Sequence, residues 1–196
     1  GYWNGSQKSY PYLTAYVLYA LQRTQDAGYA VDANVMLTMR DYLSSVLREQ
    51  NLNDELSLAE RAYILFVLKE GGSLDIALLN NLEKKRDELP LFSQAQLAMA
   101  YANTDDARKA VRILRDVLNH AKLTPRGAHF EEEQQWRWQP LMHTNTRTTA
   151  IVLQALIRID PNHPLVPKIV RWLLMVRYNA DWDTTQSSTE SILALA

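Results

Sequence analysis

Apolar side chains recur at helical spacing along almost the whole chain. Leu13, Val17, Ala20 and Leu21 follow one another at i, i+4, i+7 and i+8, which is the spacing of one buried helix face. Glycine and proline residues, beginning with Gly28, separate such segments from one another. The pattern predicts nine helices, near residues 10–27, 32–48, 57–70, 74–87, 93–103, 105–121, 145–159, 165–177 and 184–196.

Local signals refine this prediction at several boundaries. Asp32 and Ser57 are predicted N-caps, because their side chains can accept hydrogen bonds from the first turn of the helix that follows. No segment alternates cleanly between apolar and polar residues, as a half-buried strand would. The long connection near residues 122–144 is predicted to hold a short β-hairpin.

Charge is distributed unevenly among the predicted helices. The central turns of four of them lack charged residues, as Tyr12–Gln22, Gln94–Ala102 and Thr148–Ile157 illustrate, while the helices at 32–48, 74–87, 105–121 and 165–177 are amphipathic. A helix without a charged face is covered on nearly all sides, and one with such a face lies outside. We therefore predict an all-α fold of antiparallel helical hairpins in an inner and an outer layer.

Stacked hairpins of this kind either run on as an open solenoid or close into an α/α toroid. The alternation of alanine with larger residues in Gln94–Ala102 favours the toroid, because thin inner helices can approach closely and give strong curvature. The fold class predicted here is a partial α/α toroid, the architecture also called terpenoid cyclase-like.

Composition removes several classes of function. The 196 residues carry a formal net charge of −1, which gives no general electrostatic case for binding nucleic acid or an anionic membrane. Cysteine is absent, so these residues contain no disulfide, thiolate zinc site or cysteine nucleophile. The longest uninterrupted apolar run, Ala62–Leu68, is far shorter than a membrane-spanning helix.

The histidines do not form a recognisable metal or acid–base motif. His120 and His129 flank a turn, His143 precedes a helix, and His163 lies between two prolines, without HxxxH or HExxH spacing. Surface or capping roles are the commoner reading, and no metal or cofactor is expected.

Acidic residues give little support to a toroid enzyme such as a terpene cyclase or a polysaccharide-cleaving enzyme. Asp105-Asp106 reads as the start of a helix, where acids interact well with the helix dipole. Asp181 and Asp183 flank Trp182 beside a predicted helix cap, which favours a capped turn over paired catalytic acids. We expect no catalytic residue, and an enzyme stays the less favoured alternative.

The run from Phe130 to Trp138 is the most polar and aromatic stretch of the chain. A cationic or sugar partner could use it, but a solvated loop anchored by Trp136 and Trp138 is the commoner case.

The last 31 residues, Val166–Ala196, resemble the final helical hairpin of the thioester-containing domain of the α2-macroglobulin and complement family. In that family an outer helix with Arg-Trp-Leu leads through Arg-Tyr and an aromatic turn to Thr-Gln at the start of an inner helix. The corresponding residues here are Arg171-Trp172-Leu173, Arg177-Tyr178, Trp182 and Thr185-Gln186.

Two further stretches carry the resemblance. Trp138, Thr149-Ala150 and Leu153–Leu156 are similar to the preceding hairpin of the family, and Tyr2–Val31 is similar to a helix that bacterial members place after a Trp-Gly turn. The resemblance implies that residues 1–196 are a single domain, the C-terminal two-thirds of a thioester-type toroid. Trp172, Tyr178, Trp182, Thr185 and Gln186 are its expected structural motif residues.

The resemblance also implies a function for a longer parent protein. The parent would be a bacterial, periplasmic or cell-surface, broad-spectrum protease inhibitor that traps proteases, and its Cys-x-Glu-Gln thioester would lie upstream of Gly1 or be lost. This chain would be a helical scaffold, with target proteases and neighbouring β-sandwich domains as partners. We also expect self-association through uncovered inner-layer apolar surface.

The main alternative is an α-solenoid scaffold for protein–protein interaction. The segment from Asn103 to Leu114 is similar to a tetratricopeptide helix, but the helix intervals are irregular and the aromatic turn at Trp182 is foreign to such repeats. Small-angle scattering would separate an elongated superhelix from a compact arc.

Overall fold

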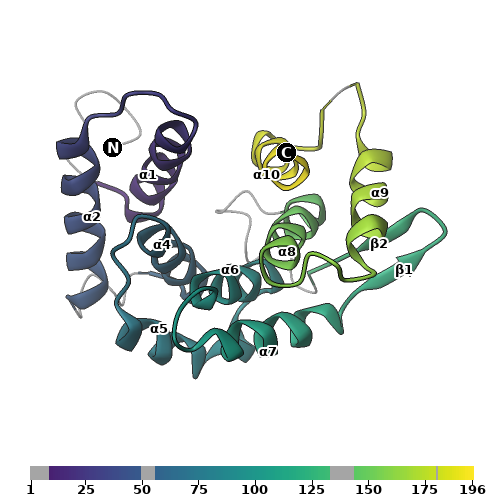
Figure 1. The fold of residues 1–196 in the computed structure, drawn as a ribbon, viewed down its shortest axis with the longest axis horizontal. Coiled ribbons are helices and arrows are strands. Elements are labelled where there is room, and N and C mark those ends of the chain that lie inside the picture. The colour runs from purple at the N-terminus through teal and green to yellow at the C-terminus, as the bar shows by residue number, and fades with distance from the viewer. Residues whose placement is uncertain (1–8, 50–55, 133–143, 180) are drawn as a thin grey trace. The chain divides into compact units, whose positions relative to one another are not determined.

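A computed structural model describes residues 9–49, 56–132, 144–179 and 181–196. The chain divides into two compact units, residues 1–89 and 90–196, and each is described by itself. Figure 1 shows both as packed helices, with one small β-hairpin in the second unit.

The first unit is built around helix α4 (Leu58–Glu70). Helix α4 packs against α1 (Pro11–Asp26), α2 (Ala33–Arg48) and α5 (Ile76–Glu83), and a short 3₁₀ helix, η1 (Arg86–Glu88), follows α5. Every residue from Ala62 to Leu68 is buried, so α4 is covered on all sides over two turns. The charge pattern had placed this helix in neither layer, and its buried apolar run shows that it is an inner helix of its unit.

Caps and one close approach fix the ends of these helices. The Asp32 side chain accepts the Asn34 N–H at 2.8 Å, and Ser57 forms a reciprocal capping box with Glu60, so both predicted N-caps are confirmed. At the other end of α4, Gly71 lies so close to α1 and α2 that a Cβ there would be 2.6 Å from Gln22 Nε2. Gln22 is itself buried and donates to the carbonyl of Val67 on α4.

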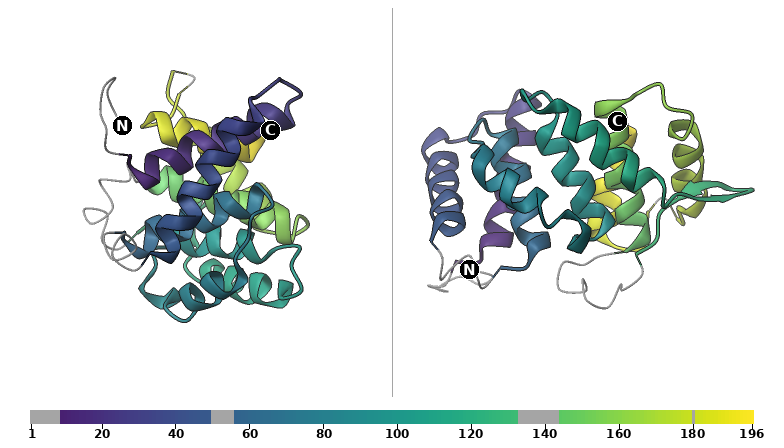
Figure 2. Two further views of the ribbon diagram at one scale, coloured as in Figure 1. Left: turned by 90° about the vertical axis from the view of Figure 1, so that its left-hand side faces the viewer. Right: turned by 90° about the horizontal axis from the view of Figure 1, so that it is seen from below.

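Helix α8 (Asn145–Ile159) is the centre of the second unit. It packs against α6 (Leu91–Tyr101), α7 (Ala107–Leu118), α9 (Val166–Val176) and α10 (Thr185–Leu195). Residues 146–153 are buried without interruption, and all eleven residues of α6 are buried too except Gln94. Figures 1 and 2 show α7 lying alongside α6. Arg108, Arg112 and Arg115 of α7 are exposed, while Lys109 lies over the ring of Tyr101 on α6 at 5.1 Å.

A two-stranded antiparallel hairpin, β1 (Lys122–Thr124) and β2 (Gly127–His129), packs on α9. It lies in the connection where a short hairpin was predicted, and it brings the backbone of Gly127 against α9. A Cβ at Gly127 would be 2.3 Å from the carbonyl oxygen of Lys168, and Gly127 has φ +137°, so only glycine fits. This contact fixes the hairpin to one turn of α9.

The predicted architecture is confirmed within each unit. Each of the nine predicted helices has a counterpart among the described residues, and the buried helices α4, α6 and α8 are covered by amphipathic ones. Helix α1 departs from the expectation. Although Tyr12–Gln22 carries no charge, only Ala15, Leu18, Tyr19 and Gln22 are buried in this helix, and Val17 is 38% exposed.

Candidate functional site

The N-terminal turns of helices α6, α8 and α10 lie side by side in the second unit. Thr144 caps α8 by accepting the Arg147 N–H at 3.1 Å, and Thr184 caps α10 by accepting the Ser187 N–H at 3.0 Å. The Ser187 hydroxyl lies 2.7 Å from the Thr144 hydroxyl and 2.9 Å from the Thr184 hydroxyl. One serine therefore joins the two caps, and each helix directs its partially positive end toward the same region.

Glu132 connects the third of these helices. Its carboxylate accepts the backbone N–H groups of Leu91 and Phe92, both at 3.1 Å, in the first turn of α6. It also accepts the Thr148 hydroxyl of α8 at 3.2 Å. A carboxylate at this place satisfies N–H groups that have no partner inside the helix and interacts favourably with the helix dipole.

Burial raises the pKa of Glu132, although the N–H groups of Leu91 and Phe92 and the Thr148 hydroxyl act in the opposite direction. The cost of removing the charged carboxylate from water therefore exceeds what its three donors return. The hydrogen bonds hold the Glu132 side chain in place although burial disfavours its charged form. Its protonation is therefore linked to the stability of the second unit.

A buried ion pair joins α8 and α10 close to these caps. Arg147 of α8 is 1% exposed, and its guanidinium is 3.9 Å from the carboxylate of Glu190 on α10. Gln154 of α8 donates to both the side chain and the backbone carbonyl of Glu190, at 2.9 and 3.1 Å. The guanidinium also lies over the ring of Phe92 at 5.7 Å, so the same residue contacts α6.

This polar cluster joins α6, α8 and α10. The Thr144, Thr184 and Ser187 hydroxyls bond to one another and to helix N–H groups, and Arg147 faces the Glu190 carboxylate. Over the described part of the chain, no three histidine, cysteine, aspartate or glutamate side chains group as metal ligands. These contacts bring the N-terminal turns of α6, α8 and α10 together.

Trp172, the first of the predicted motif residues, anchors the β-hairpin to α9. Its ring stacks on the His129 ring with centroids 4.7 Å apart and planes 6° from parallel. His129 Nε2 is 2.9 Å from a Glu131 carboxylate oxygen, and Glu131 also pairs with Lys122 across the hairpin. The hydrogen bond from Lys122, followed by that from His129, lowers the pKa of Glu131.

Trp182 lies in the turn between α9 and α10. Its indole N–H donates to the carbonyl of Leu173 at 3.0 Å, one of the last four carbonyls of α9, which have no partner within that helix. Its backbone N–H donates to Asp181 and to the Ser188 hydroxyl, and the hydrogen bond from Ser188 lowers the pKa of Asp181. Arg177 lies over the ring at 5.7 Å.

The other motif residues lie around this turn with smaller roles. Tyr178 pairs through its backbone with Asp181, and its side chain is 79% exposed. Thr185 is the first residue of α10, and its carbonyl accepts the Thr189 hydroxyl at 2.9 Å. Gln186 follows in the first turn and is half-buried. The structure thus brings Trp182, Tyr178 and Thr185 to one connection and places Trp172 on the hairpin side of α9.

The histidines and paired acids lie apart. His120 is exposed, His129 stacks on Trp172, and His163 accepts the Leu165 N–H at 3.2 Å. Asp106 is the N-cap residue of α7 and pairs with Lys109 at 3.3 Å, as expected for a helix start. His143, Trp136, Trp138 and the first eight residues lie outside the described part of the chain.

Sequence reasoning missed Arg147, Glu190 and Glu132. Two signals were present. Glu190 is the one acid in a helix otherwise made of uncharged residues, and Arg147 directly precedes the chargeless segment Thr148–Ile157. A single charge in an inner-layer helix is a reason to look for its partner on the neighbouring one.

Sequence comparison gives one relative that spans nearly the whole chain. An "Alpha-2-macroglobulin homolog" from a Nostoc strain is 24% identical over 201 residues, covering 97% of this chain and 10% of that protein. The chain is homologous to a bacterial alpha-2-macroglobulin. No family model matches the chain.

Solved structures of alpha-2-macroglobulins have the same fold. A Salmonella alpha-2-macroglobulin reacted with methylamine superposes with a TM-score of 0.77 at 20% identity, covering 98% of this chain and 12% of that one. An Escherichia coli alpha-2-macroglobulin fragment from domain MG7 to the C-terminus gives 0.78 at 19% identity, over 98% and 30%. This likeness shows the fold, an all-α arrangement of helical hairpins as predicted.

The chain spans about a tenth of the length of the curated relative that it matches. The relatives are named as alpha-2-macroglobulins, which agrees with the expectation that this chain is not an enzyme. In the described residues, no helix combines the length and hydropathy that a membrane crossing requires.

Proposed function

We propose that this chain is a helical scaffold within a broad-spectrum protease inhibitor of the alpha-2-macroglobulin kind, which acts by trapping its target protease. The observation that carries this proposal is the homology over 97% of the chain to the Nostoc protein. The common fold with the Salmonella and Escherichia coli proteins adds support.

The scaffold role is proposed from the chemistry of the second unit. Glu132, Ser187 and the Arg147–Glu190 pair hold α6, α8 and α10 in register. In the proposed parent, the chain makes up the C-terminal two-thirds of a thioester-type toroid. The chain has no cysteine, so a thioester in that parent would use a cysteine from elsewhere.

The proposed partners are target proteases, bound by the parent as a whole, and β-sandwich domains adjoining this one. Exposed apolar side chains at the end of α9 offer a face for such a domain, since Leu174 and Met175 are 51% and 54% exposed. The proposed location is the periplasm or the cell surface.

Protease assays on the longer protein that contains this segment test the trap. A trapped protease keeps its activity on a small chromogenic peptide and loses it on a large protein substrate. We expect this split with proteases of different specificity. Equal loss of both activities would indicate an active-site inhibitor, and full retention of both would indicate no inhibition; either result refutes the trap.

The scaffold role has a separate test in the same protein. Trp182→Ala should reduce trapping, because it removes the indole N–H that joins the α9–α10 turn to Leu173. Tyr29→Ala, at a side chain that is 70% exposed, is the control and should leave trapping unchanged. Equal trapping by both variants would mean that the turn has no part in the function.

Self-association of the isolated chain is also proposed. Val17 on α1 and Ile192 on α10 are 38% and 58% exposed, although both helices were predicted to be inner ones. Sedimentation velocity should show concentration-dependent oligomers that the double variant Val17→Gln, Ile192→Gln suppresses. A monomer at all concentrations would refute this part.

A further inference from the structure

One side of helix α9 is exposed along its length and has basic residues at one end and apolar residues at the other. This outer stripe of α9 consists of Lys168, Arg171, Leu174 and Met175. Their spacing of i, i+3, i+6 and i+7 keeps them within about 120° of the helix circumference. Ile169 and Leu173, on the opposite side, are buried, and α9 packs on α8 and β2.

The basic residues of α9 lie at the end where a helix disfavours them. Lys168 is in the first turn and Arg171 is in the second, whereas the helix contains no acidic residue and has no side-chain N-cap. The N-terminal end of a helix carries partial positive charge, which repels a cation and attracts an anion. An anionic group of a partner lying against this end would reverse that unfavourable interaction.

The acids nearest in sequence are engaged elsewhere. Glu131 of the hairpin pairs with Lys122, and Asp181 accepts a backbone N–H in its own turn at 3.0 Å. Among the described residues, neither Lys168 nor Arg171 forms an ion pair. The basic end of the outer stripe therefore keeps its positive charge for a group from outside the chain.

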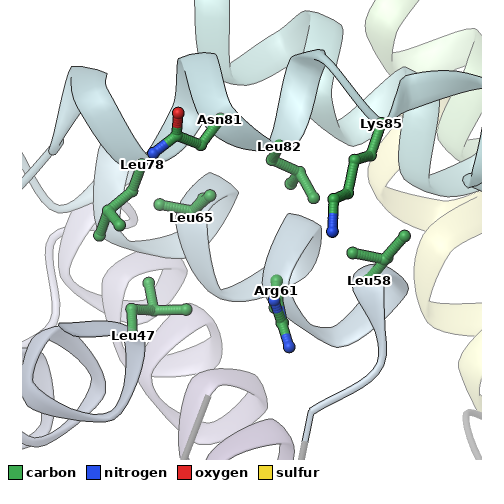
Figure 3. Close-up of a pocket in the computed structure, with 8 residues that line it drawn as sticks. All are labelled: Leu47, Leu58, Arg61, Leu65, Leu78, Asn81, Leu82 and Lys85. Carbon is green, nitrogen blue, oxygen red and sulfur yellow. The ribbon is translucent and has the colours of Figure 1, made fainter. Parts of the chain in front are cut away.

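A protein surface suits the outer stripe better than a small ligand does. The stripe lies on a convex helix, and Leu174 and Met175 are 51% and 54% exposed, whereas small ligands bind in concave sites. The leucine-lined hollow of Figure 3, about 150 Å³ in volume, is in the first unit, and none of its lining residues belongs to α9. Apolar contact bordered by charge is the usual composition of a protein–protein interface.

We propose that the outer stripe of α9 docks against an adjoining domain of the parent protein, which presents carboxylates to Lys168 and Arg171 and an apolar side chain to Leu174 and Met175. This rests on the proposed function, in which the chain is part of a larger protein; the chain spans about a tenth of the curated relative. The two ends of the stripe are about 10 Å apart along the helix, so the carboxylates and the apolar side chain of the partner have a defined order.

A zero-length carbodiimide cross-link tests the basic end in the longer protein, because it joins an amine only to a carboxylate in contact with it. Mass spectrometry should find Lys168 joined to an aspartate or glutamate outside residues 1–196. The Lys122–Glu131 pair of the hairpin is the internal positive control. If that control link forms and Lys168 is unlinked, or is linked only to acids of its own chain, the proposal is overturned.

Oxidation by hydrogen peroxide tests the apolar end. Met175 is exposed and open to sulfoxide formation, whereas Met36 and Met99 are 2% and 1% exposed. We expect Met175 to oxidise at least about tenfold more slowly in the longer protein than in the isolated chain, because an interface excludes the oxidant. Met36 and Met99 should stay protected in both, which reports an intact fold. Equal rates at Met175 would show an uncovered stripe and refute the docking.

A charge reversal with a matched control separates docking from stability. In the longer protein, Lys168→Glu, Arg171→Glu should speed Met175 oxidation at least about fivefold. Arg108→Glu, Arg115→Glu, the same change at two exposed residues of α7, should leave it unaltered. The α9 variant of the isolated chain should melt no lower than wild type, since an acid suits a helix N-terminus. An oxidation rate that the α9 reversal does not change would contradict the role of charge.

Two other occupants have their own outcomes. Links from Lys168 to acids of a second copy, detected by mixing ¹⁴N- and ¹⁵N-labelled chains, would make the stripe an interface between copies, and the proposal would be wrong. It would also be wrong if phosphatidylserine vesicles, but not phosphatidylcholine vesicles, protected Met175 while the longer protein gave no link.

These readouts are independent of protease trapping. A Lys168 link in a protein that does not trap proteases would refute the proposed inhibitor function and leave the docking in place. Trapping by a protein in which Lys168 stays unlinked would refute the docking alone.

Discussion

Replacing Arg147 with methionine should destabilise the second unit strongly. The Arg147 and Glu190 charges are 3.9 Å apart, and their side chains are 1% and 10% exposed. At an effective dielectric constant of about 20 their attraction is about 4 kcal/mol, and desolvation of both groups opposes most of it. The single variant keeps the Glu190 carboxylate buried without its cation, so we expect a loss of about 3–5 kcal/mol in the free energy of unfolding.

A second variant separates the cost of an unpaired charge from the net value of the pair. In Arg147→Met, Glu190→Leu no buried charge remains, and Gln154 keeps its hydrogen bond to the backbone carbonyl of residue 190. The double variant should therefore be more stable than Arg147→Met alone, by about 1–4 kcal/mol.

Urea unfolding followed by tryptophan fluorescence measures these differences in the second unit. Four of the five tryptophans of the chain lie between residues 90 and 196. Arg171→Met on the exposed side of α9 is the matched control and should change stability by less than about 0.5 kcal/mol. An Arg147→Met variant within about 1 kcal/mol of the wild type would refute the reasoning, and so would a double variant no more stable than Arg147→Met alone.

Three further changes test the contacts around this cluster. Trp182→Phe should lower the free energy of unfolding by about 1 kcal/mol in urea titrations, because the Leu173 carbonyl loses its donor; an unchanged midpoint would exclude that contribution. Gly127→Ala should cost about 2 kcal/mol or more, since the added Cβ meets the Lys168 carbonyl at φ +137°, and retained stability in thermal melts would contradict this contact. For Glu132 the folded-state pKa is raised, so its contribution to stability is present at low pH and is lost as pH rises through that pKa. Urea unfolding should show wild type losing stability relative to Glu132→Gln as pH rises from 4.5, and a difference independent of pH would oppose this.

The elements of the fold could be predicted from sequence because their signals are local. Asp32 and Ser57 cap the helices that they precede in sequence, and the hairpin at residues 122–129 lies within the connection where it was expected. Trp182 finds its partner nine residues away, at the end of the adjoining helix. Each of these contacts depends on a short stretch of chain.

The polar cluster could not be predicted because its contacts join distant segments. Glu132 bonds to Leu91 and Phe92 about forty residues earlier, and Gln154 bonds to Glu190 thirty-six residues later. The chain pattern shows which helices are inner ones but does not specify which turn of one helix meets which turn of the next. Polar contacts such as Thr144–Ser187 and Gln154–Glu190 help to set that register between α8 and α10. The roles proposed for Trp172, Tyr178, Thr185 and Gln186 in function stay predictions.

The inner helices contain buried charged residues that the sequence pattern did not predict. Their central turns do lack charge, as in Thr148–Ile157, but Arg147 and Glu190 are almost fully buried beside those turns. An apolar stripe alone allows neighbouring helices to slide by a turn at small cost, because one leucine contact can replace another. A buried ion pair does not allow this, since a shift of one turn, about 5.4 Å, would leave both charges without a partner. We therefore expect the Arg147–Glu190 pair to add to the specificity of the α8–α10 contact more than to its stability. The double variant should stay folded, because the Thr144–Ser187 contact and the Gln154 hydrogen bond to the carbonyl of residue 190 still join the two helices.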